Sequence, residues 1–141
     1  MRKLIYSIIV CMAAMSCTFE TSDNGKLDGF WQLQQLDSLP GNIPTDMHDQ
    51  DIYWSIQRHL LEVKRINYYG IFFRFDNAND SLVIYDPYMD MRDSSDIKLT
   101  NDSLFAPIGL RGLTDSFAIV SLTNDKLILE SKYRRLYFRK Y

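Results

Sequence analysis

Short runs of apolar and aromatic residues, separated by clusters of Asp, Asn, Ser and Gly, fill most of this chain. The runs are rich in residues that suit a pleated sheet, and the clusters between them favour tight turns. The predicted strands are residues 30–36, 71–75, 82–85, 117–122, 126–130 and 133–141. Short strands with such local connections bury an apolar face by packing as an antiparallel sandwich or by closing into a barrel. The local connections favour an all-β fold, an up-and-down antiparallel barrel of about eight strands.

Two segments fit more than one structure. The apolar side chains of residues 51–66 recur at helical spacing, yet residues 53–57 within this segment are typical of a strand. Periodicity alone therefore leaves helix and strand open there. Residues 102–113 contain Pro107 and fit either one helical turn before the proline or a lid-like loop.

The N-terminus has the layout of a secretory signal. Arg2 and Lys3 precede an apolar stretch at residues 4–14, and small residues lie near its end. A helix that spans a bilayer needs about 20 apolar residues, so this stretch is too short to remain as a membrane span. We therefore expect residues 1–16 to be removed and to lie outside the fold.

Residues 14–17, Ala-Met-Ser-Cys, resemble the bacterial lipobox, in which the cysteine is acylated and becomes the new N-terminus. The chain has two cysteines, and Cys11 lies in the segment that would be removed. Cys17 would then have no intrachain partner, and acylation would remove a free thiol from an oxidising compartment. The acyl chains on Cys17 would hold the protein on a lipid bilayer, because each buried methylene contributes about 0.8 kcal/mol.

The sequence thus predicts a lipoprotein signal peptide at residues 1–16, a lipidated tether at 17–28 and one globular domain at 29–141. The expected location is the bacterial cell envelope, on the periplasmic or surface face of the outer membrane. Of 16 Lys and Arg residues, Arg2 and Lys3 leave with the signal, so 14 basic residues remain against 18 acidic ones, a formal charge near −4. A domain with this balance lacks the basic surface that nucleic acid binding needs, so we expect no nucleic acid partner.

Four stretches of the domain resemble one known family. Gly29-Phe30-Trp31 resembles the Gly-x-Trp that opens the first strand of lipocalins and other calycins. Residues 53–57, residues 81–88 and the Phe-Arg-Lys at 138–140 are similar to stretches of lipocalin-like domains in Gram-negative envelope lipoproteins. The resemblance covers residues 29–141. It implies a lipocalin-like barrel and favours strand over helix in the segment left open above.

The resemblance also implies structural roles at one end of the barrel. In lipocalins the tryptophan of the first strand seals that end, and an arginine near the last strand packs over its ring. Carried to this sequence, Gly29, Trp31 and Arg139 would close the barrel, with Arg135 as the competing arginine. A guanidinium over an indole contributes about 0.5–2 kcal/mol, so these roles would be structural.

Few side chains could support catalysis. The chain has two histidines, His48 and His59, and it lacks the motifs of serine hydrolases, phosphate-binding loops and zinc proteases. Residues 45–51 and 86–96 gather oxygen and imidazole donors, but contiguous residues rarely converge on one ion, and Asp-rich turns have the same composition. We therefore predict that the protein is not an enzyme and has no metal site or cofactor.

Three Asp-Ser-Leu triplets resemble the acceptor of an O-glycosylation system found in some Gram-negative envelopes. Their serines are Ser38, Ser81 and Ser103, all in predicted turns or at the start of a strand. The alternative is that Asp and Ser are here because they are common turn formers. Both interpretations stay open from the sequence.

The aromatic content suggests a ligand cavity. Nine Tyr, eight Phe and two Trp are many for one domain, and the interior of an eight-stranded barrel holds either side chains or one small ligand. The predicted lining residues are Trp54, Ile56, Phe73, Phe75, Tyr85 and Phe117, with Arg74 or Tyr88 nearer the mouth. The alternative is that these aromatic residues simply fill the core.

Two functions follow as expectations. The first is an envelope lipoprotein that binds a small apolar or amphipathic molecule without transforming it. The second is an accessory protein that docks on another envelope protein through residues 86–96 or an exposed strand edge.

Overall fold

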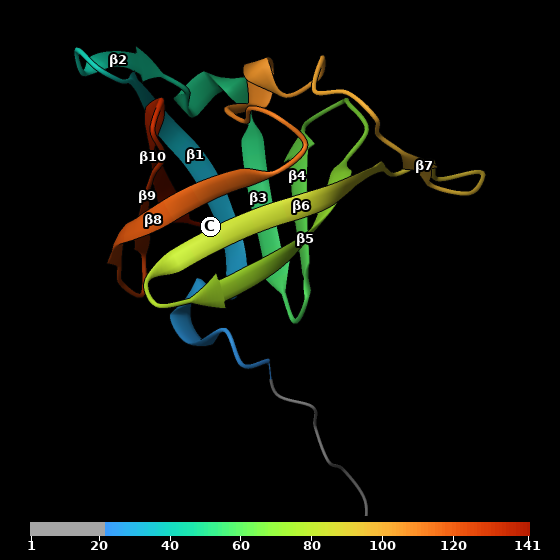
Figure 1. The fold of residues 1–141 in the computed structure, drawn as a ribbon, viewed down its shortest axis with the longest axis horizontal. Coiled ribbons are helices and arrows are strands. Elements are labelled where there is room, and N and C mark those ends of the chain that lie inside the picture. Colours follow the sequence, from blue (N-terminus) through green and yellow to red (C-terminus); the bar gives the residue numbers. More distant parts are fainter. Residues whose placement is uncertain (1–21) are drawn as a thin grey trace, which may run out of the picture.

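Ten β-strands and three short 3-10 helices make up residues 22–141, the part of the chain that this computed structural model describes (Figure 1). The strands are β1 (Gly29–Ser38), β2 (Ile43–Asp46), β3 (Ile52–Gln57), β4 (Leu60–Arg65), β5 (Ile71–Ala78), β6 (Ser81–Met89), β7 (Ile97–Lys98), β8 (Asp115–Leu122), β9 (Lys126–Glu130) and β10 (Arg134–Lys140). The 3-10 helices are η1 (Gly25–Leu27), η2 (His48–Gln50) and η3 (Ala106–Ile108). The predicted signal and Cys17 lie outside the described residues.

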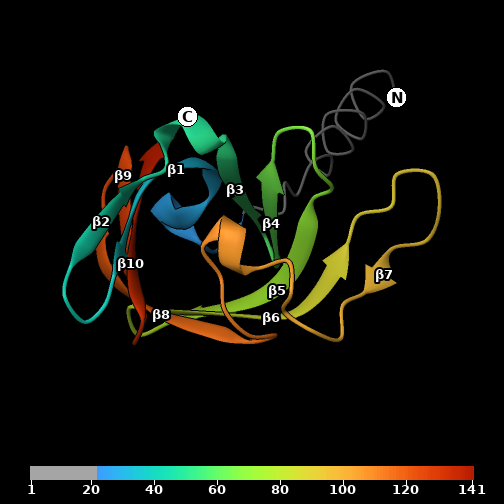
Figure 2. The same cartoon turned by 90° about the horizontal axis from the view of Figure 1, so that it is seen from above.

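Eight of the strands form a closed ring. Their order is β1-β3-β4-β5-β6-β8-β9-β10, each pair is antiparallel, and β10 pairs back onto β1 (Figure 2). Apart from β2 and β7, neighbours in the ring are neighbours in the sequence, so the predicted up-and-down barrel is confirmed. The short strand β2 pairs with the last residues of β1, and β7 pairs with β6. Sequence patterning missed both, because segments of four and two residues are too short to show alternation.

Residues 51–66 are two strands, which settles the choice left open by periodicity. Ile52, Trp54 and Ile56 alternate inward along β3, and Arg58 takes a left-handed conformation (φ 55°) in the turn before β4. Leu60, which helical spacing would place with the buried residues, is 48 % exposed at the start of β4. The strand period of two therefore describes the burial, as the resemblance implies.

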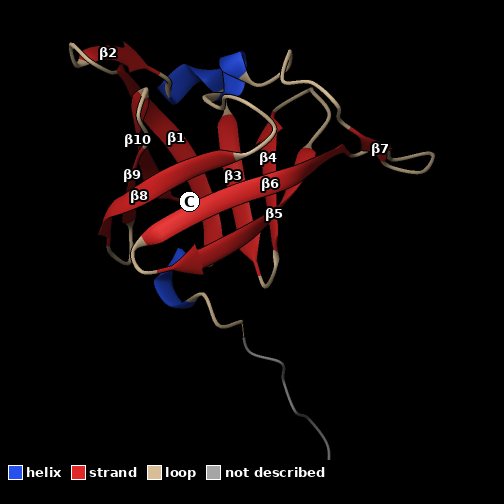
Figure 3. Cartoon of the chain, viewed as in Figure 1, coloured by secondary structure: helices blue, strands red, loops and turns tan. Residues whose placement is uncertain are grey.

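The inward side chains of the ring form the hydrophobic core, and segments outside the ring close it at both ends. At one end Leu27 of η1 is fully buried; at the other, Phe105, Ile108 and Leu110 enter the core from the loop around η3. Figures 1 and 3 show η1 and η3 at opposite ends of the barrel, with the turn between β3 and β4 on the side of η1. We call these the tether end and the lid end.

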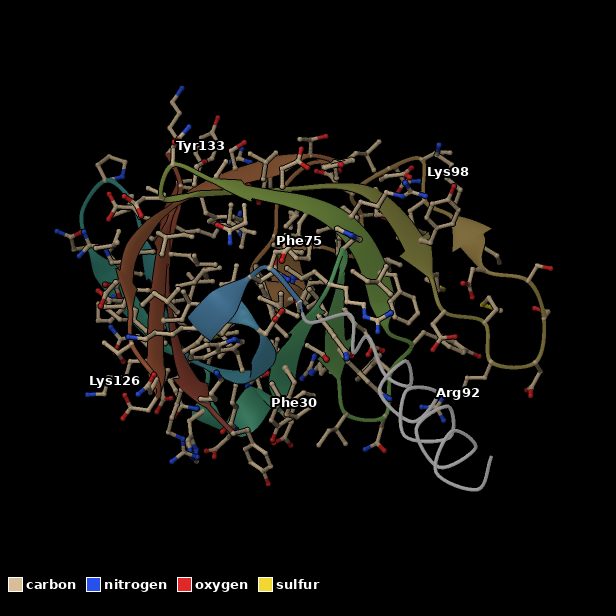
Figure 4. All side chains as sticks on the ribbon, turned by 90° about the horizontal axis from the view of Figure 1, so that it is seen from below. Phe30, Phe75, Arg92, Lys98, Lys126 and Tyr133 are labelled. Atoms are coloured by element: carbon tan, nitrogen blue, oxygen red, sulfur yellow. The ribbon has the colours of Figure 1, made fainter. Side chains whose placement is uncertain are left out.

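The globular domain begins before Gly29. Residues 17–28 were expected to be a tether, but Leu27 packs in the core and its carbonyl oxygen accepts the indole N–H of Trp31 at 2.8 Å. Seen from the tether end, η1 lies over the opening of the barrel (Figure 4). The last residues of the expected tether therefore belong to the fold.

Candidate functional site

The barrel interior is lined by aromatic side chains that contact one another. Trp54 on β3 lies 4.9 Å from Phe138 on β10 and 6.1 Å from Phe117 on β8, measured between ring centres. Phe73 on β5 lies 5.6 Å from Phe105 of the lid end. The two contacts of Trp54 cross the interior, because β3 is paired with neither β10 nor β8, and Phe105 reaches Phe73 from the loop before η3.

Five of the predicted lining residues meet in this interior. They are at most 6 % exposed and belong to the hydrophobic core: Trp54, Ile56, Phe73, Phe75 and Phe117. The alternation along the strands thus places them inward as predicted, and they fill much of the space that a ligand would need.

One polar atom in this interior has no partner. Among the described residues, two buried side-chain nitrogens lack a hydrogen bond, Trp54 Nε1 and Gln34 Nε2. Trp54 is fully buried, and the rings around it accept no conventional hydrogen bond. Leaving a buried donor unpaired costs about 1–3 kcal/mol. The indole N–H of Trp31 at the tether end donates to Leu27, so Trp54 differs from Trp31 in having an unpaired indole N–H.

The lid end is closed by residues 99–113, which contribute no strand to the ring. Phe105 contacts Phe73 on one wall. A Cβ added at Gly109 would lie 3.4 Å from Leu136 and 3.7 Å from Leu33 on the opposite wall, so the backbone there packs closely against both strands. This segment therefore spans the mouth of the barrel, and we call it the lid.

Two backbone hydrogen bonds to carboxylates order the lid, one to Asp115 of β8 and one to Asp102 within the lid itself. The N–H of Arg111 donates to Asp115 at 3.0 Å, and the N–H of Gly112 donates to Asp102 at 3.0 Å. Asp115 is 9 % exposed, and its burial raises the pKa of its carboxyl group above the usual value, an effect that hydrogen bonds and Arg134 partly offset. The anchor of the lid thus contains a carboxyl group whose charge is disfavoured by burial.

Tyr85, predicted to face inward, and both candidates for the mouth, Arg74 and Tyr88, have side chains outside the ring, so the prediction is wrong for these three residues. Arg74 is exposed and pairs with Asp86 at 3.6 Å, and Tyr85 lies with it along a groove of about 840 Å³ on the outer surface. Tyr88 contacts Lys98 of β7, whose ammonium lies 5.9 Å from the ring centre. The reason is the period of two: Arg74 follows the inward Phe73, so its side chain faces the other side of the sheet.

Comparison with known proteins gives the family. The family model described as a lipocalin-like domain matches residues 10–141. The chain belongs to the lipocalin-like domain family.

Two crystal structures share this fold. A lipocalin-like protein from Bacteroides uniformis superposes with a TM-score of 0.64 at 18 % identity, covering 83 % of this chain and 100 % of its own. An uncharacterized protein from Bacteroides eggerthii superposes with a TM-score of 0.57 at 17 % identity, covering 81 % of this chain and 98 % of its own. At these identities the likeness concerns the fold alone. No curated protein matches the chain.

In this lipocalin-like domain a lysine, and not the predicted Arg139, lies over the tryptophan of the first strand. Lys140 Nζ is 4.8 Å from the centre of the Trp31 ring, whereas Arg139 donates to Gln32 at 3.4 Å. The register explains the difference, because β10 pairs Lys140 with Trp31 and Arg139 with Gln32. Directly paired residues point to the same face of a sheet, so only Lys140 shares the face of the indole.

The competing arginine, Arg135, lies far along the same strand. It forms an ion pair with Glu130 of β9 and contributes nothing at the tether end.

The remaining predicted sites lie on the surface of the domain. Ser38 and Ser103 are exposed, while Ser81 is half-buried at the start of β6. Within residues 22–141, no three His, Cys, Asp or Glu side chains are grouped so that they could hold a metal ion. In the same range no helix is both long and apolar enough to cross a membrane.

Proposed function

We propose that this chain is a lipoprotein of the bacterial envelope, anchored through acylated Cys17, whose barrel binds a small amphipathic molecule without transforming it. The lipobox-like residues 14–17 support the anchor. The lipocalin-like barrel with its aromatic interior supports the ligand. The bilayer and the small molecule are the partners in this proposal.

The unpaired indole N–H of Trp54 carries the ligand proposal. It is an unpaired donor among aromatic side chains, so the matching ligand has an apolar body and at least one hydrogen-bond acceptor, such as a carboxylate or an ester. Few precisely placed polar groups in an apolar pocket are typical of small-molecule sites. Pairing this donor would recover the cost of its desolvation.

The ligand enters at the lid end. The interior is filled in the structure, and Phe105, Ile108 and Leu110 are core residues that do not belong to a strand of the ring. Moving them breaks no strand pairing, whereas widening the ring elsewhere would break the backbone ladder. Gly109 and Gly112 both have positive φ, at 85° and 77°, and lie near the C-terminal end of the lid. Displacement of the lid therefore makes room without breaking a strand pairing.

Native mass spectrometry and displacement of a lipid dye test this proposal on the soluble chain from Thr18 to Tyr141. A long-chain fatty acid should bind, and Trp54→Phe should weaken it about two- to tenfold, the value of one hydrogen bond. An alkane of equal length should bind both forms alike. Tyr85→Phe, which removes a hydroxyl from the outer groove, serves as the matched control and should leave both affinities unchanged. Absence of any bound mass and of dye displacement would refute the ligand.

The anchor is tested separately in cells. Metabolic labelling with palmitate should mark the wild-type protein, and Cys17→Ala should abolish both the label and the membrane fractionation. An unlabelled Cys17 in native material would refute the anchor without affecting the ligand.

A second candidate function, docking on another envelope protein, has one specific observation in its favour. Residues 66–69 and 91–94 border a second outer groove of about 640 Å³, where Tyr68 and Tyr69 are 62 % and 58 % exposed. Tyrosine and arginine are enriched where protein interfaces are strongest, and Arg92 lies in the same groove. If a partner binds there, Tyr68→Ser with Tyr69→Ser should abolish its co-purification, while Val120→Ser, an exposed residue of β8, should not.

A further inference from the structure

Residues 22–27, which we call the strap, are hydrogen-bonded to the turn between β3 and β4. The backbone N–H of Arg58 in that turn donates to Ser22 Oγ at 3.2 Å, and Asn24 Nδ2 donates to the carbonyl oxygen of Arg58 at 2.8 Å. Leu27 of the following η1 is fully buried. The point where the chain leaves the domain is therefore fixed at the tether end, beside this turn (Figure 1).

The length of the remaining chain limits how far this turn can be from an anchor. Cys17 is five residues from Ser22, and an extended chain covers about 3.3–3.6 Å per residue, so the separation is at most about 18 Å. This argument rests on the proposed acylation of Cys17. Given that acylation, the strap brings the tether end to the membrane and leaves little freedom for the barrel to turn over.

The surface at this end has the chemistry of a headgroup contact. Leu60, 48 % exposed, stands beside the turn, and the outer groove runs from the turn along β4 and β5. The groove contains the cationic Arg74, which also faces Asp86, and the anionic Glu62 and Asp76, and Phe72 of β5 adds apolar surface. A zwitterionic phospholipid offers the complement of both signs, a phosphate for the guanidinium and an ammonium for a carboxylate.

From the strap, the short tether and this surface, we propose that the tether end of the barrel lies against the phospholipid bilayer. The turn between β3 and β4 sits at headgroup level, and the outer groove is open to zwitterionic headgroups. The lid end then points away from the bilayer into the aqueous phase. The lid and the exposed Tyr68 and Tyr69 would therefore meet soluble molecules and not the lipid of the anchoring leaflet.

Spin labels on the mature protein, residues 17–141, purified from host membranes test this orientation. The mature chain has no cysteine other than Cys17, so His59→Cys at the turn and Tyr68→Cys at the opposite end each give a single label. Each is measured in vesicles of phosphatidylcholine and phosphatidylethanolamine and in the soluble chain, with oxygen and a water-soluble nickel chelate as relaxing agents. The ratio of oxygen to nickel accessibility should rise at least twofold on reconstitution at position 59 and stay unchanged at position 68. Equal behaviour of the two labels would overturn the proposal.

Flotation of the same vesicles separates failure of the anchor from failure of the orientation. Protein that does not float with the vesicles shows that Cys17 is not acylated, which refutes the proposed anchor. Protein that floats while both labels stay aqueous keeps the anchor and overturns the orientation alone.

Two variants then test the contacts themselves, with the fold checked by circular dichroism. Asn24→Ala removes the three hydrogen bonds that this side chain donates, to Ser22, Asp28 and Arg58, and Leu60→Asp puts a charge at headgroup level. Each variant should return the label at position 59 towards the aqueous value. Leu113→Asp, at an exposed residue of the lid, is the matched control and should change nothing. If all three variants leave the label as in the wild type, neither the strap nor Leu60 sets the orientation, and the proposed contact is wrong.

Discussion

Lys140 lies over the indole ring of Trp31, with its ammonium nitrogen 4.8 Å from the ring centre and donating to the carbonyl oxygen of Lys26 at 3.3 Å. One side chain of the last strand therefore joins the first strand to η1 at the tether end. Gly29 makes room for it, because a Cβ at this position (φ 137°) would lie only 2.5 Å from Lys140 Cε. The glycine, the tryptophan and the lysine act as one closure of the barrel.

Lys140→Met should lower the free energy of unfolding by about 0.5–2 kcal/mol, because it keeps an apolar stem but removes the cation from the indole. Urea unfolding followed by tryptophan fluorescence measures it. Arg139→Met is the control, because Arg139 is exposed and lies on the opposite face; its effect should stay within about 0.5 kcal/mol. A larger loss from Arg139→Met than from Lys140→Met would contradict the assignment.

Gly29→Ala should be destabilising by about 1–3 kcal/mol, because the added methyl group overlaps the lysine stem and the backbone is strained for any residue with a Cβ. In a Lys140→Ala background the overlap is absent, so Gly29→Ala should cost less there. The difference between the two costs is the coupling energy of a double-mutant cycle. Additive costs would show that Gly29 serves the backbone alone.

This closure shows what the sequence could and could not predict. The Gly-x-Trp motif predicted the first strand and its tryptophan, because its residues are adjacent in the sequence. The cation over the ring depends on the register between β1 and β10, and β1 carries an irregularity between Leu33 and Gln35 that shifts the pairing. A shift of one residue moves a side chain to the other face, so the choice between Arg139 and Lys140 required the pairing itself.

Phe105→Ala should destabilise the domain by about 3–5 kcal/mol, since it removes a fully buried ring that packs on Phe73. The same variant should speed association of a lipid dye if the ligand enters at the lid end as proposed, because the lid occupies that mouth of the barrel. Stopped-flow fluorescence measures the rate and urea unfolding the stability. Leu104→Ala, at a neighbour that is 45 % exposed, should change neither. Unaltered association with Phe105→Ala would place the entrance elsewhere.

The lid also explains why the candidate site was only partly predicted. Alternation identifies inward residues such as Trp54 and Phe117 within each strand, but it is silent about a loop that enters the barrel from its end. Residues 102–113 therefore remained ambiguous, although Phe105 and Leu110 are as buried as the strand residues. The prediction of Arg74 near the mouth, next to the inward Phe73, ignored the period of two, because neighbouring residues of a regular strand face opposite sides of the sheet.

The three Asp-Ser-Leu triplets differ in access, and this gives an ordered prediction for O-glycosylation. If the native host modifies them, Ser38 and Ser103 should carry glycan, since both are exposed. Ser81 should not, because it is half-buried at the start of β6 and paired with Ala118 of β8. Intact mass and peptide mapping of protein from the host measure this, with Ser103→Ala as the variant that removes one glycan. A mass equal to the acylated peptide alone would refute the modification.

Asp115 should make the stability of the domain fall as the pH rises. Burial raises the pKa of its carboxyl group in the folded state, so folding favours the protonated form. The stabilisation from this proton is fully present below the ordinary aspartate pKa, about 3.9, and is lost as the pH rises through the higher folded value. Asp115→Asn removes this titration while keeping an acceptor for the N–H of Arg111.

The measurement is urea unfolding of wild type and Asp115→Asn from pH 3 to pH 7. Other carboxyl groups contribute equally to both proteins, so their effects cancel when the two free energies are subtracted. The wild-type value minus the variant value should decrease steadily with rising pH, because only the wild type loses the stabilising proton. A constant difference would mean that burial of the carboxylate is balanced by the hydrogen bonds from Arg111 and Ser116 and by Arg134, and a difference that increases with pH would mean that they outweigh it. The lid would then be held by a charged anchor at neutral pH and released by acid, the reverse of what burial predicts.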